Sequence, residues 1–293
     1  MKWLFCVVKG KEDNTYPFYT IPVRGCLFIF TIHYLFQITY SYLCLVHNMK
    51  RIVINTFITL LICCVQCLSF QESIAQKSNS DSLYTYSTAS SGGTGKFYLG
   101  REIAQVMGAS NAEWLDRASR PQEEHTQLTI DKIELPADGV IADIGAGTGY
   151  YTFKLAPKVP KGKVYAIEIQ DEMIAALNEK KKKLNNTNVE VIKGSPTSPN
   201  LPANSVDLAI MVDVYHELEY PVEMLTSIKK SLKKDGRLLL IEYKGEDPAV
   251  AIRPLHKTTV KQLSKELGAN GFQLAYQGDF LPIQHFLLYK KTE

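Results

Sequence analysis

A short apolar run that ends in a glycine-rich turn is the feature that most constrains how this chain folds. Residues 140–142 are Val-Ile-Ala, Asp143 follows, and the next alternate positions are Gly145, Gly147 and Gly149. A continuous apolar run of this kind is typical of a strand that is covered on both faces. Glycines before the next helix allow a tight turn in which a ligand approaches the backbone. The pattern therefore predicts a parallel α/β sheet with a ligand site at this turn.

Strand and helix patterns alternate through the rest of the chain. We expect strands at 140–144, 163–167, 189–193, 206–212 and 237–242, and helices at 150–155, 171–184 and 221–232. Thr259 and Gln262 form a capping box at the start of a further helix, and residues 272–277 and 285–290 fit a closing antiparallel hairpin. The predicted fold class is a doubly wound, mostly parallel seven-stranded sheet that binds its ligand at the carboxyl ends of the strands.

Two apolar stretches precede the main body of the chain. Residues 26–46 are long enough to span a bilayer. Residues 49–75 have the basic start, the apolar middle and the small-x-small cleavage site of a secretory signal. We expect 49–75 to be a signal peptide or membrane anchor, and 1–48 to be an apolar leader or the product of an over-long gene reading. The alternative is a two-helix membrane hairpin. The predicted location is exported, in the periplasm, or anchored to a membrane.

The body divides into three predicted parts. Residues 76–96 are rich in Ser, Thr and Gly, which predicts a flexible linker. Residues 97–135 are expected to form a helical cap, with amphipathic pieces at 100–107 and 112–118 and a longer helix that begins near Pro121. Residues 136–293 are expected to form the α/β domain.

Charge and cysteine content narrow the function. From residue 76 onward there are 27 basic and 27 acidic residues, so the whole formal excess of +3 lies in the leader. A nucleic-acid partner is therefore not expected, because such proteins usually carry a basic surplus. All six cysteines precede residue 70, which excludes a disulfide framework, a thiolate nucleophile and a Cys-ligated zinc site from the body. No metal site is assigned.

The spacing of the glycines leads to a family resemblance. A dinucleotide fingerprint has glycine at the first, third and sixth positions, but the sixth position here is Tyr150. Glycine at the first, third and fifth positions behind Asp143 resembles motif I of the class I S-adenosylmethionine-dependent methyltransferases. The resemblance covers residues 97–290. The sequences Tyr-His-Glu at 215–217 and Asp-Gly at 235–236 are similar to those of the branch that acts on small molecules. The resemblance implies a Rossmann-like methyltransferase fold, S-adenosyl-L-methionine as cofactor and a small-molecule or lipid-like acceptor.

The resemblance also implies a set of cofactor-binding residues at the ends of the first four strands. They are Asp143, Gly145, Gly147, Gly149, Glu168, Ser195 and Asp213. Glu168 lies about twenty residues past the turn, where a carboxylate accepts both ribose hydroxyls. Ser195 stands where the family usually has an acid that holds the adenine amine. A serine hydroxyl can still accept a hydrogen bond there.

Candidate catalytic residues follow from the need to remove a proton. A hydroxyl or ammonium acceptor must lose a proton to a general base, and histidine titrates in the required range. The candidates are Asp213 and His216, with Glu217 to orient His216, and also His256 and His285. The alternative for each histidine is a packing or capping role.

Two other functions remain open at this point. One is a binding module that keeps the cofactor pocket without catalysis, which the serine at position 195 favours. The other is a nicotinamide-dependent oxidoreductase, against which Tyr150 counts. Membrane association through the leader is a further expectation.

Overall fold

The computed structural model describes residues 83–292, which belong to one compact unit. The predicted leader at 1–48 and the predicted signal or anchor at 49–75 lie outside the described residues. Within the described range, no helix is both long and apolar enough to cross a membrane.

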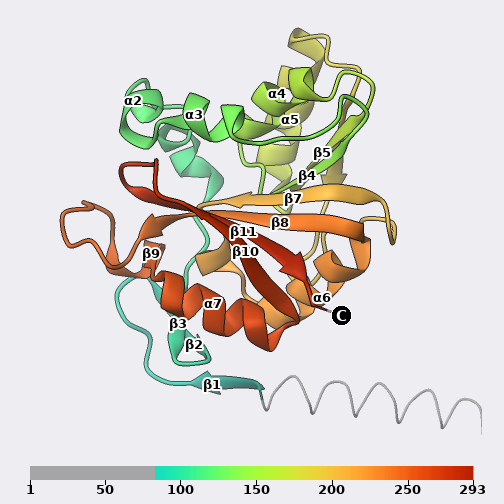
Figure 1. Cartoon of the computed structure of the whole chain (residues 1–293). Helices are drawn as coiled ribbons and strands as arrows, with labels where there is room; N and C mark the ends of the chain where they lie inside the picture. Colours follow the sequence, from blue (N-terminus) through green and yellow to red (C-terminus); the bar gives the residue numbers. More distant parts are fainter. Residues whose placement is uncertain (1–82, 293) are drawn as a thin grey trace, which may run out of the picture. The chain divides into compact units, whose positions relative to one another are not determined.

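The described residues are built around a twisted central sheet (Figure 1). Its strands are β4 (Val140–Ile144), β5 (Lys163–Glu168), β6 (Val189–Lys193), β7 (Val206–Val212), β8 (Leu232–Lys244), β10 (Phe272–Gly278) and β11 (Gln284–Lys291). Their order is β10-β11-β8-β7-β4-β5-β6, and a two-residue strand, β9 (Lys257–Thr258), pairs with β8. Strands β4 to β8 pair in parallel, whereas β11 is antiparallel to both of its neighbours. The predicted fold class, including the closing hairpin, is confirmed.

Both faces of the sheet are covered because its strands are apolar at successive positions. In β4, Ala142 packs in one buried cluster with α6 (Pro221–Ser231) and α7 (Val260–Ala269). The adjacent Ile141 packs in a second cluster with α4 (Tyr150–Leu155) and α5 (Asp171–Lys183). Figure 1 shows these two helix pairs on opposite sides of the sheet. Burying one such aliphatic side chain contributes about 1.5–3 kcal/mol, so this two-sided core sets the register of the strands.

The chain order reverses at β4, and this reversal positions the site. Strand β4 lies between β5, which follows it in the chain, and β7, which comes two strands later. The chain runs outward from β4 through β5 to β6 and then crosses back to β7 on the other side of β4, so a crevice opens outside the carboxyl ends of the strands at this point. The glycine turn after β4 lies at this crevice.

The region before the sheet differs from the prediction. Strands β1 (Tyr84–Tyr86), β2 (Gly93–Tyr98) and β3 (Arg101–Ala104) form a three-stranded antiparallel sheet. The linker predicted at 76–96 and the helical piece predicted at 100–107 are therefore wrong over these strands. The reason is the two-residue turn at Leu99 and Gly100, whose φ angles of 47° and 91° suit a type I′ hairpin.

The rest of the predicted cap at 97–135 is helical but interrupted. It contains the 3₁₀ helix η1 (Ala109–Trp114) and the α-helices α2 (Arg120–Glu124) and α3 (Thr126–Asp131). The single helix expected from Pro121 is broken at His125, whose left-handed φ of 52° ends α2 and begins α3. This break lets α2 place buried Arg120 beside the crevice.

The β2–β3 hairpin is held to the main sheet by a buried ion pair. The Arg101 guanidinium donates from Nε and Nη2 to the two carboxylate oxygens of Glu266 in α7, each at 2.8 Å. Glu266 also accepts a hydrogen bond from the Tyr215 hydroxyl at 2.9 Å. The third guanidinium nitrogen, Nη1, donates to the backbone carbonyl of His216 at 3.0 Å. The hairpin thus fixes a segment that lies next to the crevice.

Candidate functional site

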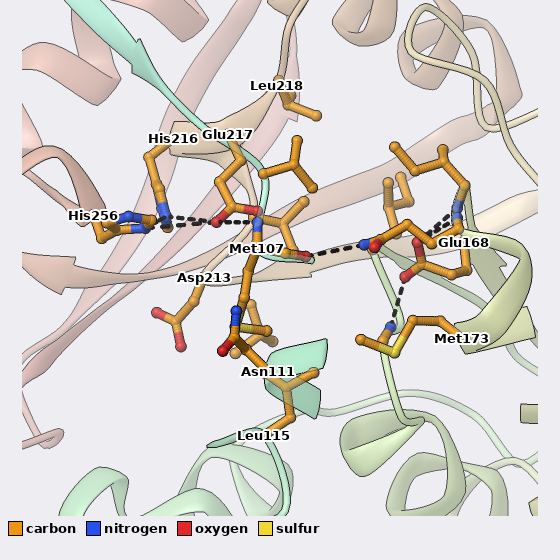
Figure 2. Close-up of a pocket in the computed structure, with 18 of the residues that line it drawn as sticks. Met107, Asn111, Leu115, Glu168, Met173, Asp213, His216, Glu217, Leu218 and His256 are labelled. Atoms are coloured by element: carbon orange, nitrogen blue, oxygen red, sulfur yellow. Dashed lines mark hydrogen bonds and ion pairs between the residues drawn. The ribbon is translucent and has the colours of Figure 1, made fainter. Parts of the chain in front are cut away.

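A cavity of about 570 Å³ lies at the carboxyl ends of β4, β5 and β7. Segments that precede the sheet and segments that connect its strands contribute to its walls. Of the residues predicted for the site, the cavity is lined by Gly145, Gly147, Glu168, Ser195, Asp213, His216 and His256. Asp143, Gly149 and His285 are not among its lining residues. Figure 2 shows Glu168 and Met173 at one side and His216, Glu217 and His256 at the other.

The glycine turn forms part of the cavity wall through two of its three glycines. Gly145 and Gly147 have φ angles of 73° and 54°, a region that strains other residues. A Cβ atom on Gly147 would lie 2.7 Å from Leu115 Cδ1, so a side chain here would have to displace the end of Leu115 as well as strain the backbone. At Gly149 the added Cβ would collide with Phe153 and Leu177 instead. Gly149 therefore serves the packing of α4 against α5 and does not face the cavity.

Asp143 organises the turn from beneath it. Its Oδ2 accepts a hydrogen bond from the Thr152 hydroxyl of α4, and its carboxyl is buried. Burial raises the pKa of Asp143 to about 6, although hydrogen bonds from Thr152 favour its ionised form. This geometry supports a role for Asp143 in the organisation of the turn.

The raised pKa of Asp143 predicts a pH-dependent effect of Asp143→Asn on stability. Between pH 3.8 and about 6, the unfolded chain ionises at this position while the folded chain keeps its proton. The wild-type protein therefore loses stability as pH rises through this window, and the asparagine variant does not. We expect the stability of the variant relative to wild type to increase by about 2 kcal/mol between pH 4 and pH 7.5. Urea unfolding at the two pH values measures this difference, and a constant difference would contradict the assignment.

Glu168 lies at the end of β5 with its carboxylate held in place by three backbone groups. Its Oε2 accepts from the Gly147 N–H at 2.9 Å, and its Oε1 accepts from the N–H groups of Ile169 and Gln170 at 2.7 and 3.1 Å. A carboxylate offers about four lone-pair sites, so acceptor capacity remains on the side that lines the cavity. Because Glu168 binds Gly147 directly, it also links the second strand to the glycine turn.

Two histidines and a buried carboxylate form a chain at the opposite side of the cavity. His216 Nδ1 lies 2.6 Å from Glu242 Oε2, and its Nε2 lies 3.0 Å from His256 Nδ1. Both oxygens of Glu242 are engaged, since Oε1 accepts from the N–H groups of Val214 and Tyr215 at 3.1 and 2.7 Å. Burial lowers the pKa of His216, but the charge and hydrogen bond of Glu242 outweigh this effect and raise the pKa above its ordinary value.

Glu242 makes the shorter contact with His216, and Glu217, which was expected to orient the ring, makes a longer one. Glu217 Oε1 lies on the other side of the ring, 3.7 Å from His216 Nε2 and 3.5 Å from His256 Nδ1. It also accepts a hydrogen bond from the Met107 N–H at 3.3 Å. Glu217 therefore closes a cluster of three side chains that faces the cavity.

Asp213 and His285 have different surroundings. Asp213 has a left-handed φ of 55° and lines the cavity. Its carboxylate accepts two hydrogen bonds from Gln284 Nε2, at 3.0 and 2.8 Å, and lies 3.9 Å from Arg120. Burial raises its pKa well above the ordinary value. His285 instead pairs with Glu246 at 2.9 Å and lies apart from the cavity lining, so the structure does not bring it to the other two histidines.

Comparisons with known proteins identify the family of this fold and site. The family profile described as a methyltransferase domain matches residues 142–240. The crystal structure of an S-adenosylmethionine-dependent methyltransferase from Aquifex aeolicus has 28% sequence identity and a TM-score of 0.59, and the match covers 63% of this chain and 98% of that one. Residues 142–240 therefore form a methyltransferase domain, and the chain is similar in sequence and fold to class I S-adenosylmethionine-dependent methyltransferases.

Two further methyltransferase relatives differ in what their names say of the acceptor. The uncharacterized methyltransferase YcgJ of Bacillus subtilis is 26% identical over 144 residues, which are 48% of this chain and 56% of the relative. The tRNA U34 carboxymethyltransferase of Helicobacter pylori is 30% identical over 108 residues, which are 35% of this chain and 40% of the relative. The chain spans about half the length of the curated relatives that it matches first.

The methyltransferase cofactor, S-adenosylmethionine, fits the side of the cavity that contains the glycine turn. A Cβ at Gly145 would meet Val214 and one at Gly147 would meet Leu115, so the two glycines let the turn lie close to these cavity-lining side chains. Glu168 offers a carboxylate to the two ribose hydroxyls, and Ser195 lines the same cavity with its hydroxyl. Ile169 and Met173 add apolar surface for the adenine ring. These residues would hold the cofactor.

Several residues of this methyltransferase site were missed in the sequence. Glu242 was predicted only as the end of a strand, and Arg120, in the short α2, was assigned no role. A signal for Glu242 was present, because it is the acid at the carboxyl end of the central strand β8. Glu217 and His256 are separated by 39 positions in the chain, and only the fold brings them within 3.5 Å.

Proposed function

We propose that this protein transfers a methyl group from S-adenosylmethionine to a small-molecule or lipid-like acceptor. The observation that carries the proposal is the two-sided cavity, with Gly147 and Glu168 on one side and the His216–Glu217–His256 cluster on the other. When bound, the cofactor supplies a methyl group on a positively charged sulfur. The chain's own residues then need to align the acceptor, exclude water and remove its proton.

The histidine side of the cavity is suited to receive the reacting group of the acceptor. Glu242 accepts from His216 Nδ1, so the lone pair of a neutral His216 is directed from Nε2 toward His256. The cluster can accept a proton there without a large movement. The surrounding wall includes apolar side chains, namely Val106, Met107, Leu115, Leu218, Met224 and Ile252. This composition favours an acceptor with an apolar body and one reactive hydroxyl, amine or thiol.

The experiment is a turnover assay on the full-length chain in a mild detergent. The protein is incubated with S-adenosylmethionine and panels of small alcohols, phenols, amines, thiols, lipids and tRNA, and release of S-adenosylhomocysteine is followed by mass spectrometry. We expect release with at least one small or lipid-like acceptor. We also expect His256→Ala to lower the rate about 10²–10⁴-fold while cofactor affinity stays within twofold. Release with tRNA alone would contradict the proposed acceptor class.

A cofactor-binding module without catalysis is the second candidate, and Ser195 favours it. The serine hydroxyl donates to the Ser198 carbonyl at 3.3 Å and keeps its lone pairs. As a neutral acceptor, it would bind the adenine amine more weakly than an acid would. Tight cofactor binding with no turnover across all acceptor panels would support this candidate over the enzyme.

We further propose that residues 49–75 export the protein or anchor it to a membrane. The basic start, apolar middle and small-x-small site in the sequence support this proposal. N-terminal sequencing of the native protein tests it. A first residue near Gln76 supports a cleaved signal peptide, and a first residue at Met49 supports an anchor. Peptides from residues 1–25 would contradict the expectation that residues 1–48 come from an over-long gene reading.

A further inference from the structure

We propose that His216, Glu217 and His256 bind one divalent transition-metal cation at the acceptor side of the cavity. Each side chain offers one ligand atom, and the three atoms lie within 4.8 Å of one another. The role of the cation in catalysis rests on the proposed methyl transfer, whereas its binding does not. The site was not predicted from the sequence, and it lies on the side of the cavity away from Glu168 (Figure 2).

The separations between the three ligand atoms match those around a bound cation. His216 Nε2 and His256 Nδ1 are 3.0 Å apart, and Glu217 Oε1 lies 3.5 Å from His256 Nδ1 and 3.7 Å from His216 Nε2. In a tetrahedral zinc site with bonds of about 2.1 Å, two ligand atoms are about 3.4 Å apart. The three observed distances lie on both sides of this value, so a cation could be bound with shifts of a few tenths of an ångström.

Glu242 prepares His216 to act as a ligand. A carboxylate only accepts hydrogen bonds, so the close contact at 2.6 Å places a proton on His216 Nδ1. In the neutral ring, Nε2 then carries the free lone pair that a cation requires. A carboxylate behind a metal-binding histidine fixes the tautomer and orientation of the ring and increases its basicity. The hydrogen bonds that Glu242 accepts from Val214 and Tyr215 hold it in this position.

The composition of the cluster indicates which cation it prefers. Two imidazole nitrogens and one carboxylate suit Zn²⁺, Fe²⁺ or Co²⁺, whereas Mg²⁺ and Ca²⁺ prefer oxygen ligands. Three protein ligands leave at least one coordination position open, as in catalytic zinc sites. All three ligand residues line the cavity, so the open position is accessible to the acceptor.

This geometry narrows the acceptor to a molecule with an ionisable hydroxyl or thiol. With the cation bound, the lone pairs of His216 and His256 serve as ligands, so the cation replaces the cluster as the means of deprotonation. Binding of the acceptor's oxygen or sulfur to the cation lowers the pKa of the group, and its proton leaves to water. The deprotonated atom then forms a bond to the methyl carbon. The carbon–sulfur bond of the cofactor breaks at the same time, and its electron pair stays on the departing sulfur. An amine acceptor would gain less, because it binds such a cation through the lone pair that must attack the methyl group.

The test measures metal binding directly on the full-length chain in detergent. The protein is stripped with a chelator, dialysed against Zn²⁺ and analysed by mass spectrometry for metal content. Isothermal titration with Zn²⁺ gives the affinity, and substitution with Co²⁺ gives a visible absorption band from the ligands. We expect one Zn²⁺ per chain, no binding of Mg²⁺, and at least a 100-fold loss of affinity in His256→Ala and Glu217→Gln. Glu242→Gln is expected to lose 10–100-fold.

His285→Ala is the matched control, because His285 also pairs with a glutamate but lies outside the cavity lining. It is expected to keep wild-type affinity for Zn²⁺. Equal Zn²⁺ binding in the wild type, His256→Ala and Glu217→Gln, or no binding to the wild type, would overturn the site. Absence of Zn²⁺ binding to the wild type would mean that His216 and His256 are joined only by a hydrogen bond.

Turnover of the same samples separates failure of the metal site from failure of the proposed function. Loss of turnover on chelation, with recovery on addition of Zn²⁺, supports both. Undiminished turnover in a metal-free protein overturns the catalytic role of the cation and leaves methyl transfer intact. Stoichiometric Zn²⁺ binding without turnover of any acceptor supports the site and contradicts the proposed function.

Discussion

Glu168→Ala is expected to weaken the binding of S-adenosylmethionine by at least 100-fold. The substitution removes a carboxylate that is placed to accept two ribose hydroxyls, and a hydrogen bond to a charged group is worth about 1.5–3 kcal/mol. It also removes the acceptor of the Gly147 N–H, so the glycine turn loses its link to β5. Isothermal titration of the full-length protein with the cofactor measures the change.

Two comparisons make this result specific. Glu190→Ala removes an acid from the neighbouring strand β6, where the side chain is half exposed and pairs with Lys163; its cofactor affinity should equal that of wild type. Gly147→Val should abolish binding, because its Cβ would lie 2.7 Å from Leu115 Cδ1 and its φ of 54° suits glycine. Retained affinity in both Glu168→Ala and Gly147→Val, with unchanged circular dichroism, would refute the cofactor site.

Arg101→Ala is expected to destabilise the protein by about 3–5 kcal/mol. The Glu266 side chain is fully buried, and Arg101 is its charge partner. Removing one member of a buried ion pair leaves an uncompensated charge, which costs this much. Unfolding in urea, followed by circular dichroism, gives the free energy of unfolding of the variant and the wild type.

The double variant Arg101→Met/Glu266→Leu tests the cause of this loss. It removes both charges and keeps apolar volume, so it should be more stable than Arg101→Ala. Lys193→Ala is the exposed control, because its pair with Asp171 is largely in solvent and should contribute little. A small effect of Arg101→Ala, equal to that of Lys193→Ala, would show that the hairpin is not held by its ion pair.

Periodicity predicted the main sheet because its strands are buried on both faces. The run at 140–144 has few alternatives to a central parallel strand, and strands β4 to β8 follow the same rule. The hairpin at 93–104 was misread because its short strands contain charged residues such as Lys96 and Glu102, which are buried only through tertiary contacts. No local pattern reports a partner such as Glu266, which lies 165 positions away.

The site was predictable where its residues lie at strand ends and unpredictable elsewhere. Gly147 and Glu168 follow from their positions after β4 and β5. The pairing of His216 with His256, and the separation of both from His285, depend on how η4 (Pro254–His256) folds back over the sheet. The role of Glu242 could not be predicted either, because an acid at a strand end can serve several purposes. Its contact with the buried His216 is formed only in the folded structure.

The hydrogen bond from Arg101 to the His216 carbonyl has a consequence for cooperativity. The hairpin and the central sheet share this contact and the Glu266 ion pair, so neither keeps its buried charges satisfied without the other. We therefore expect one unfolding transition for the whole described unit, with coincident curves from probes in both parts. The family match begins at residue 142, but these contacts extend the expected cooperative unit to the hairpin that begins at Gly93.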